Sequence, residues 1–370
     1  MKTNLKIIDP LFDLSQWMNR EAFVVWRNPG GTNFYGFTAS VGILEYGSIP
    51  DKDTFIFSPF DPKGAYPTIA FYPKEKNIEH DSSKVEGFFP VNTRENDPDT
   101  KEEYCNRIEL LTQKMRDGHL RKCVLSRRID IDKPEERRAP ELFSLLCNRY
   151  PDAFVSIIHV PGVFTWLGAT PERLLKVKGQ QAQTTALAAT RPFEGVLPDL
   201  SEWNEKEKEE QQLVADFILN VLKKLDLQVV AFNGPKSVQA GNLVHLKTDI
   251  QFSINHRADV LSLIKALHPT PAVCGLPREK ALEMISSLEP NDREYYAGYL
   301  GLVNKDGMEL YVNLRCMRWI RGRASLFVGG GITAASIPEQ EWDETNFKAH
   351  TLLDVIEKLS NLAGKNLNAH

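Results

Sequence analysis

A run of three glycines near the end of the 370-residue chain is followed closely by two glutamates. Gly329, Gly330 and Gly331 carry backbone N–H groups that no side chain obstructs, and such groups can bind an anion. Glu341 and Glu344 are three residues apart, so they lie on one face of the helix expected there. Since carboxylate oxygens are the ligands of hard divalent cations, the pattern indicates an anionic substrate beside a metal ion.

Each part of this pattern also fits an ordinary structural role. The glycines lack the G-x-G-x-x-G spacing, and G-x-x-x-x-G-K-[ST] occurs nowhere in the sequence, so the run equally fits a flexible strand-to-helix connection. Ser336 and Glu339 fit a capping box with Pro338 in the first turn. The glutamates then equally fit a solvated acidic helix start in which Glu344 pairs with Lys348, worth about 0.3–0.5 kcal/mol.

A third carboxylate, Glu210, lies on a helix predicted over residues 201–225. The apolar stripe of this helix consists of Leu213, Val214, Phe217, Ile218, Val221, Leu222 and Leu225. Glu210 precedes the leading members of the stripe by helical spacings, so it points along the buried face. A buried carboxylate needs a partner, and either a metal shared with Glu344 or an arginine would supply one.

Two residues upstream are candidates for proton transfer. Lys122 opens a predicted strand and is either an edge-strand lysine that deters aggregation or a buried base. As a base its pKa must fall from about 10.4 toward 7 or 8, at a cost of about 4 kcal/mol. Glu172 follows Thr170 and Pro171, so it is either part of a helix start or a general acid whose proton is retained by an apolar surround.

The composition excludes several classes of protein. Net charge is −4, so no basic surface for nucleic acid is expected, and no apolar run approaches the roughly 20 residues of a membrane span. Five cysteines are scattered without a C-x-x-C pair, and the chain opens without an apolar signal run. We expect a soluble, cytoplasmic protein that binds neither nucleic acid nor membrane.

The pattern of elements predicts an α+β fold. Strands are expected near residues 23–26, 34–37, 54–57, 69–72, 122–131, 154–159, 227–232 and 243–254, and helices near 100–117, 139–149, 202–225, 258–267 and 278–287. A polar loop is expected over 81–100, between a β-rich part at 1–95 and the region 100–365. Turns between 295–303, 309–320 and 323–328 favour a terminal antiparallel meander over a doubly wound sheet.

Seven stretches in sequence order resemble the motifs of the chorismate-utilising enzymes. They are residues 122–127, 168–172, 184–191, 268–273, 293–298, 312–315 and the terminal glycine-rich block with its E-x-x-E sequence. Within that family the chain is most similar to isochorismate synthases. The resemblance implies one large chorismate-binding domain, like that of anthranilate synthase component I, with layered antiparallel sheets and helices around a central cleft.

The resemblance also implies a set of site residues. Glu210 and Glu344 would ligate Mg²⁺, with Glu341 bound directly or through water. The carboxylates of chorismate would be bound by Arg315, Tyr296 and the backbone of Gly329, Gly330 and Gly331, in a cleft also lined by Leu187, Thr190, His268 and Ala272. An arginine fork and free N–H groups suit that task.

The implied reaction is an isomerisation of chorismate to isochorismate. Lys122 would deprotonate a water that attacks C2 while Glu172 protonates the departing C4 hydroxyl. A lysine at this position favours water over ammonia, so no glutamine amidotransferase subunit is expected. The alternatives are a salicylate synthase, which goes on to eliminate pyruvate, and a homologue that binds chorismate without turnover; the product would feed menaquinone or siderophore synthesis.

Several residues depart from the family pattern, among them Glu207 and Lys208, which follow Lys206 where aspartate and arginine are usual. Ala189 stands where glycine is usual, Cys274 where glycine often follows, and Gln211 where histidine usually follows the first metal-binding glutamate. The added methyl group of Ala189 is expected to narrow the nucleophile's side of the cleft.

Overall fold

The computed structural model describes residues 6–18, 20–74 and 96–367. Most of the loop expected over 81–100 therefore lies outside the described residues. No helix within these ranges is long and apolar enough to cross a membrane.

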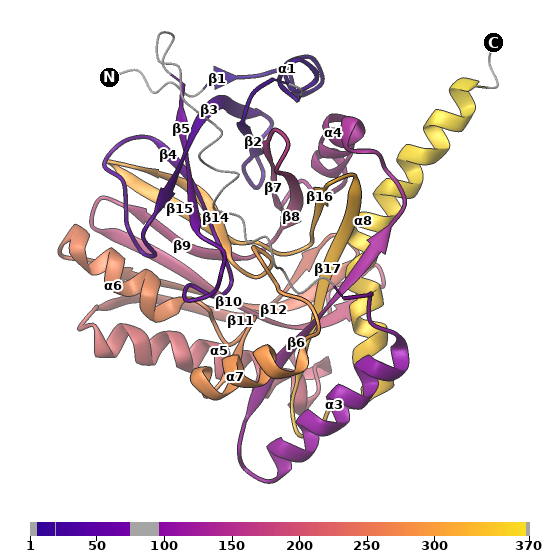
Figure 1. Cartoon of the computed structure of the whole chain (residues 1–370). Helices are drawn as coiled ribbons and strands as arrows, with labels where there is room; N and C mark the ends of the chain where they lie inside the picture. Colours follow the sequence, from indigo (N-terminus) through magenta and orange to yellow (C-terminus); the bar gives the residue numbers. More distant parts are fainter. Residues whose placement is uncertain (1–5, 19, 75–95, 368–370) are drawn as a thin grey trace.

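The strands form two antiparallel sheets that share one long strand, β3 (Figure 1). The first sheet runs, in order of pairing, through β13 (Gly275–Leu276), β6 (Lys122–Ile131), β17 (Arg323–Ile332), β16 (Cys316–Ile320), β8 (Phe164–Thr170), β7 (Phe154–Val160), β2 (Phe23–Arg27), β3 (Tyr35–Leu44) and β1 (Lys6–Ile7). The second runs through β11 (Val229–Ala240), β12 (Leu243–Ser253), β10 (Gln181–Pro192), β9 (Arg173–Lys178), β15 (Gly307–Val312), β14 (Tyr299–Asn304), β4 (Thr54–Ser58) and β5 (Thr68–Pro73), and returns to β3. These antiparallel pairings confirm the predicted α+β class.

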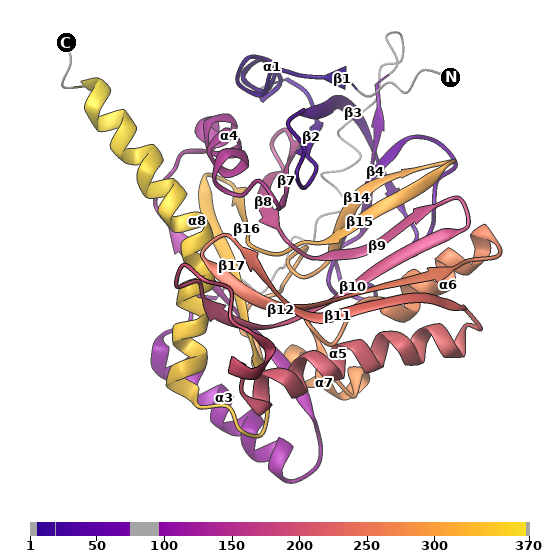
Figure 2. The same cartoon turned by 180° about the vertical axis from the view of Figure 1, so that it is seen from behind.

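Helices cover the outer faces of both sheets (Figures 1 and 2). They are α1 (Pro10–Trp17), α3 (Lys101–Arg116), α4 (Ala139–Arg149), α5 (Glu205–Lys224), α6 (Arg257–Leu267), α7 (Arg278–Leu288) and α8 (Pro338–Leu367). The long α8 packs on β17 and against α3 and α4, whereas α5 packs on β10 of the second sheet. The helices that carry the predicted metal ligands, α5 and α8, therefore pack on different sheets.

Aromatic rings fill the space between the two sheets. Phe57 of β4 packs edge-on against Trp166 of β8 with 5.7 Å between ring centroids, and it also stacks on Tyr295 at 4.1 Å. Such contacts bury large apolar areas and fix the separation of the sheets. A second apolar cluster, including Phe143 and Leu352, lies between the first sheet and the helices α1, α4 and α8.

The terminal meander is only partly confirmed. The single strand predicted over 309–320 is wrong, because β15 ends at Val312 and β16 begins at Cys316 in the other sheet. Arg315 takes a left-handed φ of 48° at this crossing, which an extended strand does not allow. Two hairpins, β14–β15 and β16–β17, therefore replace one meander, and the break leaves Arg315 where the sheets meet.

A second crossing occurs between β8 and β9. Pro171 and Glu172 connect these strands, which belong to different sheets, so the alternative of a helix start at Thr170 is wrong. Glu172 and Arg315 thus lie on neighbouring crossovers between the sheets, since Val312 N donates to Glu172 O at 3.0 Å.

Candidate active site

A pocket opens where the two crossovers meet β6, β10 and β17. The predicted residues that line it are Glu172, Leu187, Thr190, Glu210, Ala272, Tyr296, Arg315, Gly329 and Gly331. His245 and Lys348, which were not among the predicted site residues, line it as well. These residues come from distant parts of the chain, and only the two-sheet fold brings them together.

Lys122 is buried beside this pocket with no exposed surface. Its strand β6 has β17 on one side and β13 on the other, so the edge-strand interpretation is wrong. Nζ of Lys122 donates to Oε1 of Glu210 at 2.8 Å. Burial raises the pKa of Glu210, but the charge and hydrogen bond of Lys122, with two further lysines, more than offset it and lower the pKa below its usual range.

The pKa of Glu172 is shifted in the opposite direction, because burial outweighs the nearby positive charges. Its side chain is buried, and burial raises its pKa from 4.5 to about 8 although the charges of Lys122, Lys348 and Arg315 act to lower it. A carboxyl group in this environment is mainly protonated at neutral pH. It can therefore donate a proton inside the pocket.

Arg315 is fixed by a histidine that sequence reasoning missed. Nη2 of Arg315 lies 2.6 Å from Nε2 of His245, whose Nδ1 lies 2.9 Å from the carbonyl oxygen of Ala189. Burial, and then the charge of Arg315, lower the pKa of His245 well below its usual range, so the ring is neutral. A neutral ring with Nδ1–H donating to Ala189 accepts from the arginine at Nε2 and sets the direction of the guanidinium.

The glycines that were candidates for a flexible connection are instead strand residues, so the connection interpretation is wrong. Gly329, Gly330 and Gly331 pair with 126, 125 and 124 of β6. A Cβ atom on Gly331 would lie 2.5 Å from Oε1 of Glu210, and one on Gly329 would lie 2.9 Å from the hydroxyl of Tyr296. A side chain at either position would therefore displace the carboxylate of Glu210 or the hydroxyl of Tyr296.

The two glutamates after the glycines lie in the first turns of α8, which begins at Pro338. Ile337, and not Ser336, precedes the first residue of this helix, and the hydroxyl of Ser336 accepts from the N–H of Thr333. Glu341 is buried, and its Oε1 accepts from Nζ of Lys206 at 2.6 Å. Glu344 accepts from Lys348 at 2.7 Å, the i,i+4 pair expected for an ordinary helix start.

The donor chemistry of this region fits a hard divalent cation. Glu210, Glu341 and Glu344 supply only carboxylate oxygens, and Oε2 of Glu341 is buried without a hydrogen-bond partner among the described residues. The carboxylates do not converge, however: within the described ranges, no three acidic, histidine or cysteine side chains are arranged to hold a metal ion. Each glutamate is turned toward a lysine.

His268, like Lys122, Gly330, Glu341 and Glu344, is a predicted residue that does not line the pocket. Its ring is buried, and Nε2 lies 3.2 and 3.1 Å from the carbonyl oxygens of Pro59 and Phe60. Burial lowers the pKa of His268 to about 4, so the ring is neutral and donates from Nε2. It fixes the end of β4 to the loop after α6.

The departures from the family pattern have distinct local settings. Ala189 adopts φ 61°, a left-handed conformation in which glycine is unstrained and alanine is not. Gln211 is buried and donates to the hydroxyl of Thr248 at 2.9 Å. Cys274 is buried beside β6 with Cys123, and burial raises the pKa of both thiols.

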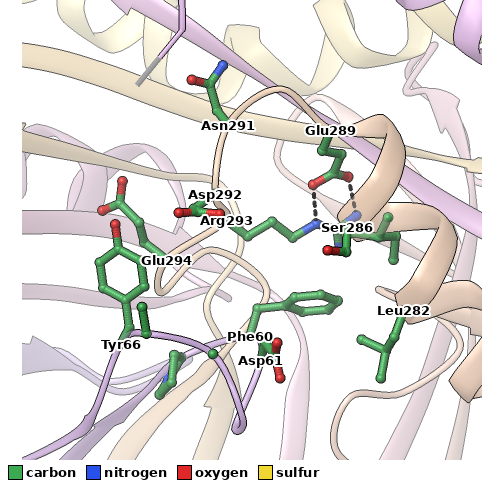
Figure 3. Close-up of a pocket in the computed structure, with 14 residues that line it drawn as sticks. Phe60, Asp61, Tyr66, Leu282, Ser286, Glu289, Asn291, Asp292, Arg293 and Glu294 are labelled. Atoms are coloured by element: carbon green, nitrogen blue, oxygen red, sulfur yellow. Dashed lines mark hydrogen bonds and ion pairs between the residues drawn. The ribbon is translucent and has the colours of Figure 1, made fainter. Parts of the chain in front are cut away.

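A larger hollow lies nearby but shares no lining residue with the active-site pocket (Figure 3). Glu289 and Arg293 face each other there, with Nε of Arg293 donating at 2.8 Å. Glu289 also accepts from the N–H of Ser126 at 2.7 Å, and Arg293 donates to the carbonyl oxygen of Val124 at 2.6 Å. This buried pair supports the backbone of β6 directly after Lys122.

The two-sheet fold and the pocket at its crossovers define a class of protein, and the chain belongs to the chorismate-binding enzyme family, whose model matches residues 67–357. It is similar to isochorismate synthase EntC of Escherichia coli K12, 35% identical over 246 residues that cover 63% of this chain and 62% of the relative. The alignment thus spans less than two thirds of that relative's length. It is also 30% identical to isochorismate synthase MenF of the same strain over 302 residues, covering 76% and 70% of the two chains.

Solved structures show the same fold. The E. coli MenF structure superposes with a TM-score of 0.75 at 23% identity, covering 96% of this chain and 95% of the other. A structure described as a 2,3-dihydroxybenzoate-specific isochorismate synthase, DhbC from Bacillus anthracis, gives a TM-score of 0.73 at 24% identity, covering 94% and 99%.

Proposed function

We propose that this chain is a Mg²⁺-dependent isochorismate synthase, an isomerase that converts chorismate to isochorismate. The observation that carries the proposal is the contrast between two buried groups at one pocket: Glu172, whose pKa is raised to about 8, and Lys122, paired with Glu210. Two titratable groups in different environments can serve as the acid and the base of one reaction. The isochorismate synthases among its relatives support this assignment.

Substrate binding would rest on fixed positive charge and strand backbone. Arg315, oriented by His245, offers a planar fork to one carboxylate of chorismate, and Lys348 adds an ammonium at the same pocket. Tyr296 and the glycines of β17 supply the neighbouring wall. Leu187 and Ala272 add apolar surface to the lining of the pocket. The ring of the substrate would therefore be positioned there with little bulk water.

Glu210 and Glu344, with Glu341, are proposed to hold Mg²⁺. The unpartnered Oε2 of Glu341 and the all-oxygen donor set support this choice. When bound, the ion would offset the negative charge of a substrate carboxylate and hold it in place.

The proton transfers are assigned to the protein. Lys122, in its neutral form and no longer paired with Glu210, takes a proton from water as the water oxygen forms a bond to C2, and the double bonds of the ring shift as the C4–oxygen bond breaks. Glu172 gives its proton to the departing hydroxyl, which leaves as water. One water is consumed and one is released, so the product is an isomer of the substrate.

Other expectations from the sequence are part of the proposal. Residues 1–95 and 100–365 are proposed to form one folding unit, supported by the pairing of β4 with β14 and of β2 with β7. The water-based chemistry assigned to Lys122 needs no ammonia-delivering amidotransferase subunit.

The test is incubation of purified protein with chorismate and Mg²⁺, followed by chromatography with mass detection. A product of unchanged mass and different retention supports the proposal. Salicylate with pyruvate would instead identify a salicylate synthase, and no turnover with metal present would contradict the assignment of an enzyme.

A further inference from the structure

Three lysines alternate with the three glutamates proposed to bind metal. Lys122 pairs with Glu210 at 2.8 Å, Lys206 with Glu341 at 2.6 Å, and Lys348 with Glu344 at 2.7 Å. The three ammonium groups balance the three carboxylates. A divalent ion added among them would meet a neutral group of side chains rather than an acidic one, which opposes its binding.

The three lysines differ in how firmly they are held. The side chain of Lys122 has no exposure, and Lys348 also donates to the carbonyl oxygen of Gly329 at 2.9 Å. Lys206 has the most exposed of the three side chains, at 32%, and pairs only with Glu341 among the hydrogen bonds and ion pairs of the described residues. Of these lysines, Lys206 is the one that can swing into solvent without breaking a second contact.

The position of Lys206 places its charge among all three carboxylates. It lies one helical turn before Glu210 on α5, and its ammonium interacts electrostatically with Glu210 and Glu344 as well as with Glu341. Glu341 uses only Oε1 for this contact, and its Oε2 is buried without a partner in the described part of the chain. One ammonium therefore leaves a buried carboxylate half satisfied, whereas a metal ion can bind both of its oxygens.

We propose that Lys206 is a built-in counter-ion that stabilises the metal-free site and must be displaced by the divalent ion. The inference rests on the metal site of the proposed function. In the metal-free protein, Lys206 holds the carboxylates of α5 and α8 apart, each turned to its own lysine. When the ion binds, Lys206 moves to solvent, and Glu341 turns to the ion together with the other two glutamates.

A titration of the protein with Mg²⁺ alone, measured by calorimetry in the absence of chorismate, tests this inference. Lys206→Gln should tighten Mg²⁺ binding by about tenfold or more, since a positive charge that competes with the ion is gone. The matched control is Lys208→Gln, which removes the same charge from the same helix where Lys208 pairs with the exposed Glu205. The control should bind Mg²⁺ like the wild type.

Thermal unfolding gives a second readout. Without metal, Lys206→Gln should unfold at a lower temperature than Lys208→Gln, because Glu341 is left buried without its lysine. Added Mg²⁺ should raise its midpoint more than that of the wild type. Unchanged or weaker Mg²⁺ binding by Lys206→Gln, with the wild type still binding, would overturn the role of Lys206 and leave the metal site standing.

Labelling of the wild-type protein keeps the test independent of any variant. An amine-reactive reagent with peptide mass mapping should label Lys206 faster with Mg²⁺ than without it, while Lys208 is unchanged. Equal or slower labelling of Lys206 at saturating Mg²⁺ would contradict its displacement. Failure of both wild type and Lys206→Gln to bind Mg²⁺ would instead contradict the metal site itself.

Discussion

Replacing Glu172 with glutamine should change how the stability of the protein depends on pH. Burial raises the pKa of Glu172 from 4.5 to about 8 in the folded state, so the folded protein keeps a proton that the unfolded chain loses. The contribution of protonated Glu172 to the free energy of unfolding is therefore fully present below about pH 4.5 and is lost as pH rises toward about 8. Each pH unit between these values costs about 1.4 kcal/mol, so the wild type loses about 3–4 kcal/mol relative to Glu172→Gln between pH 5 and pH 8.

Urea unfolding of both proteins at intervals from pH 5 to pH 9 measures this difference. Other titrating groups are shared by the two proteins and cancel when one free energy of unfolding is subtracted from the other. Glu209→Gln, which changes an exposed glutamate of α5, is the control and should give a curve parallel to the wild type. A constant difference between wild type and Glu172→Gln across this range would refute a protonated, buried Glu172.

Further outcomes follow from the same pocket. Turnover should decline as pH rises through about 8, because Glu172 is then ionised and cannot donate its proton; a pH–rate profile of kcat checks this. Gly331→Ala should reduce kcat by at least about a hundredfold, since the new Cβ would lie 2.5 Å from Oε1 of Glu210; steady-state kinetics that match the wild type would contradict it. Ala189→Gly should raise the free energy of unfolding by about 0.5–1 kcal/mol in urea, because it relieves a left-handed alanine, and a loss of stability would disprove that strain. Lys122→Ala should abolish turnover yet retain Mg²⁺-dependent chorismate binding by calorimetry, and residual activity would remove Lys122 from its role as base.

The periodicity of single helices and strands was sufficient to predict part of the site. The helical spacing on α5 predicts that Glu210 points inward, and its side chain is 16% exposed and paired with Lys122. The predicted strand at 122–131 coincides with β6, which places Lys122 at its first residue. These features depend on contacts within one element, so one segment of sequence is enough to predict them.

The crossings between sheets could not be predicted in this way. Residues 309–320 read as one strand because both halves are apolar and extended, and only the left-handed φ of Arg315 divides them. The glycine run looks like a loop in sequence, yet it pairs with β6 as part of a strand, and its lack of side chains leaves room for Glu210 and Tyr296. Such requirements come from neighbours that are distant along the chain.

Pairs between distant segments account for the residues that were missed. His245 lies in a strand of ordinary composition, and its role arises from Arg315, 70 residues later. Lys206 belongs to a run of alternating Lys and Glu that resembles a solvated face, and its partner Glu341 is 135 residues away. The one signal in the sequence that could have directed attention to Lys206 is its position four residues before the inward-pointing Glu210.

In the proposed reaction this pocket adds water to C2 of chorismate and releases the C4 hydroxyl. Reaction with chorismate and Mg²⁺ in H₂¹⁸O, with mass detection of the product, follows the oxygen of the added water. The product should be isochorismate that carries the heavy oxygen at C2, and Lys122→Ala should form none. Isochorismate without the heavy oxygen, or no isomer of chorismate at all, would contradict the proposed chemistry.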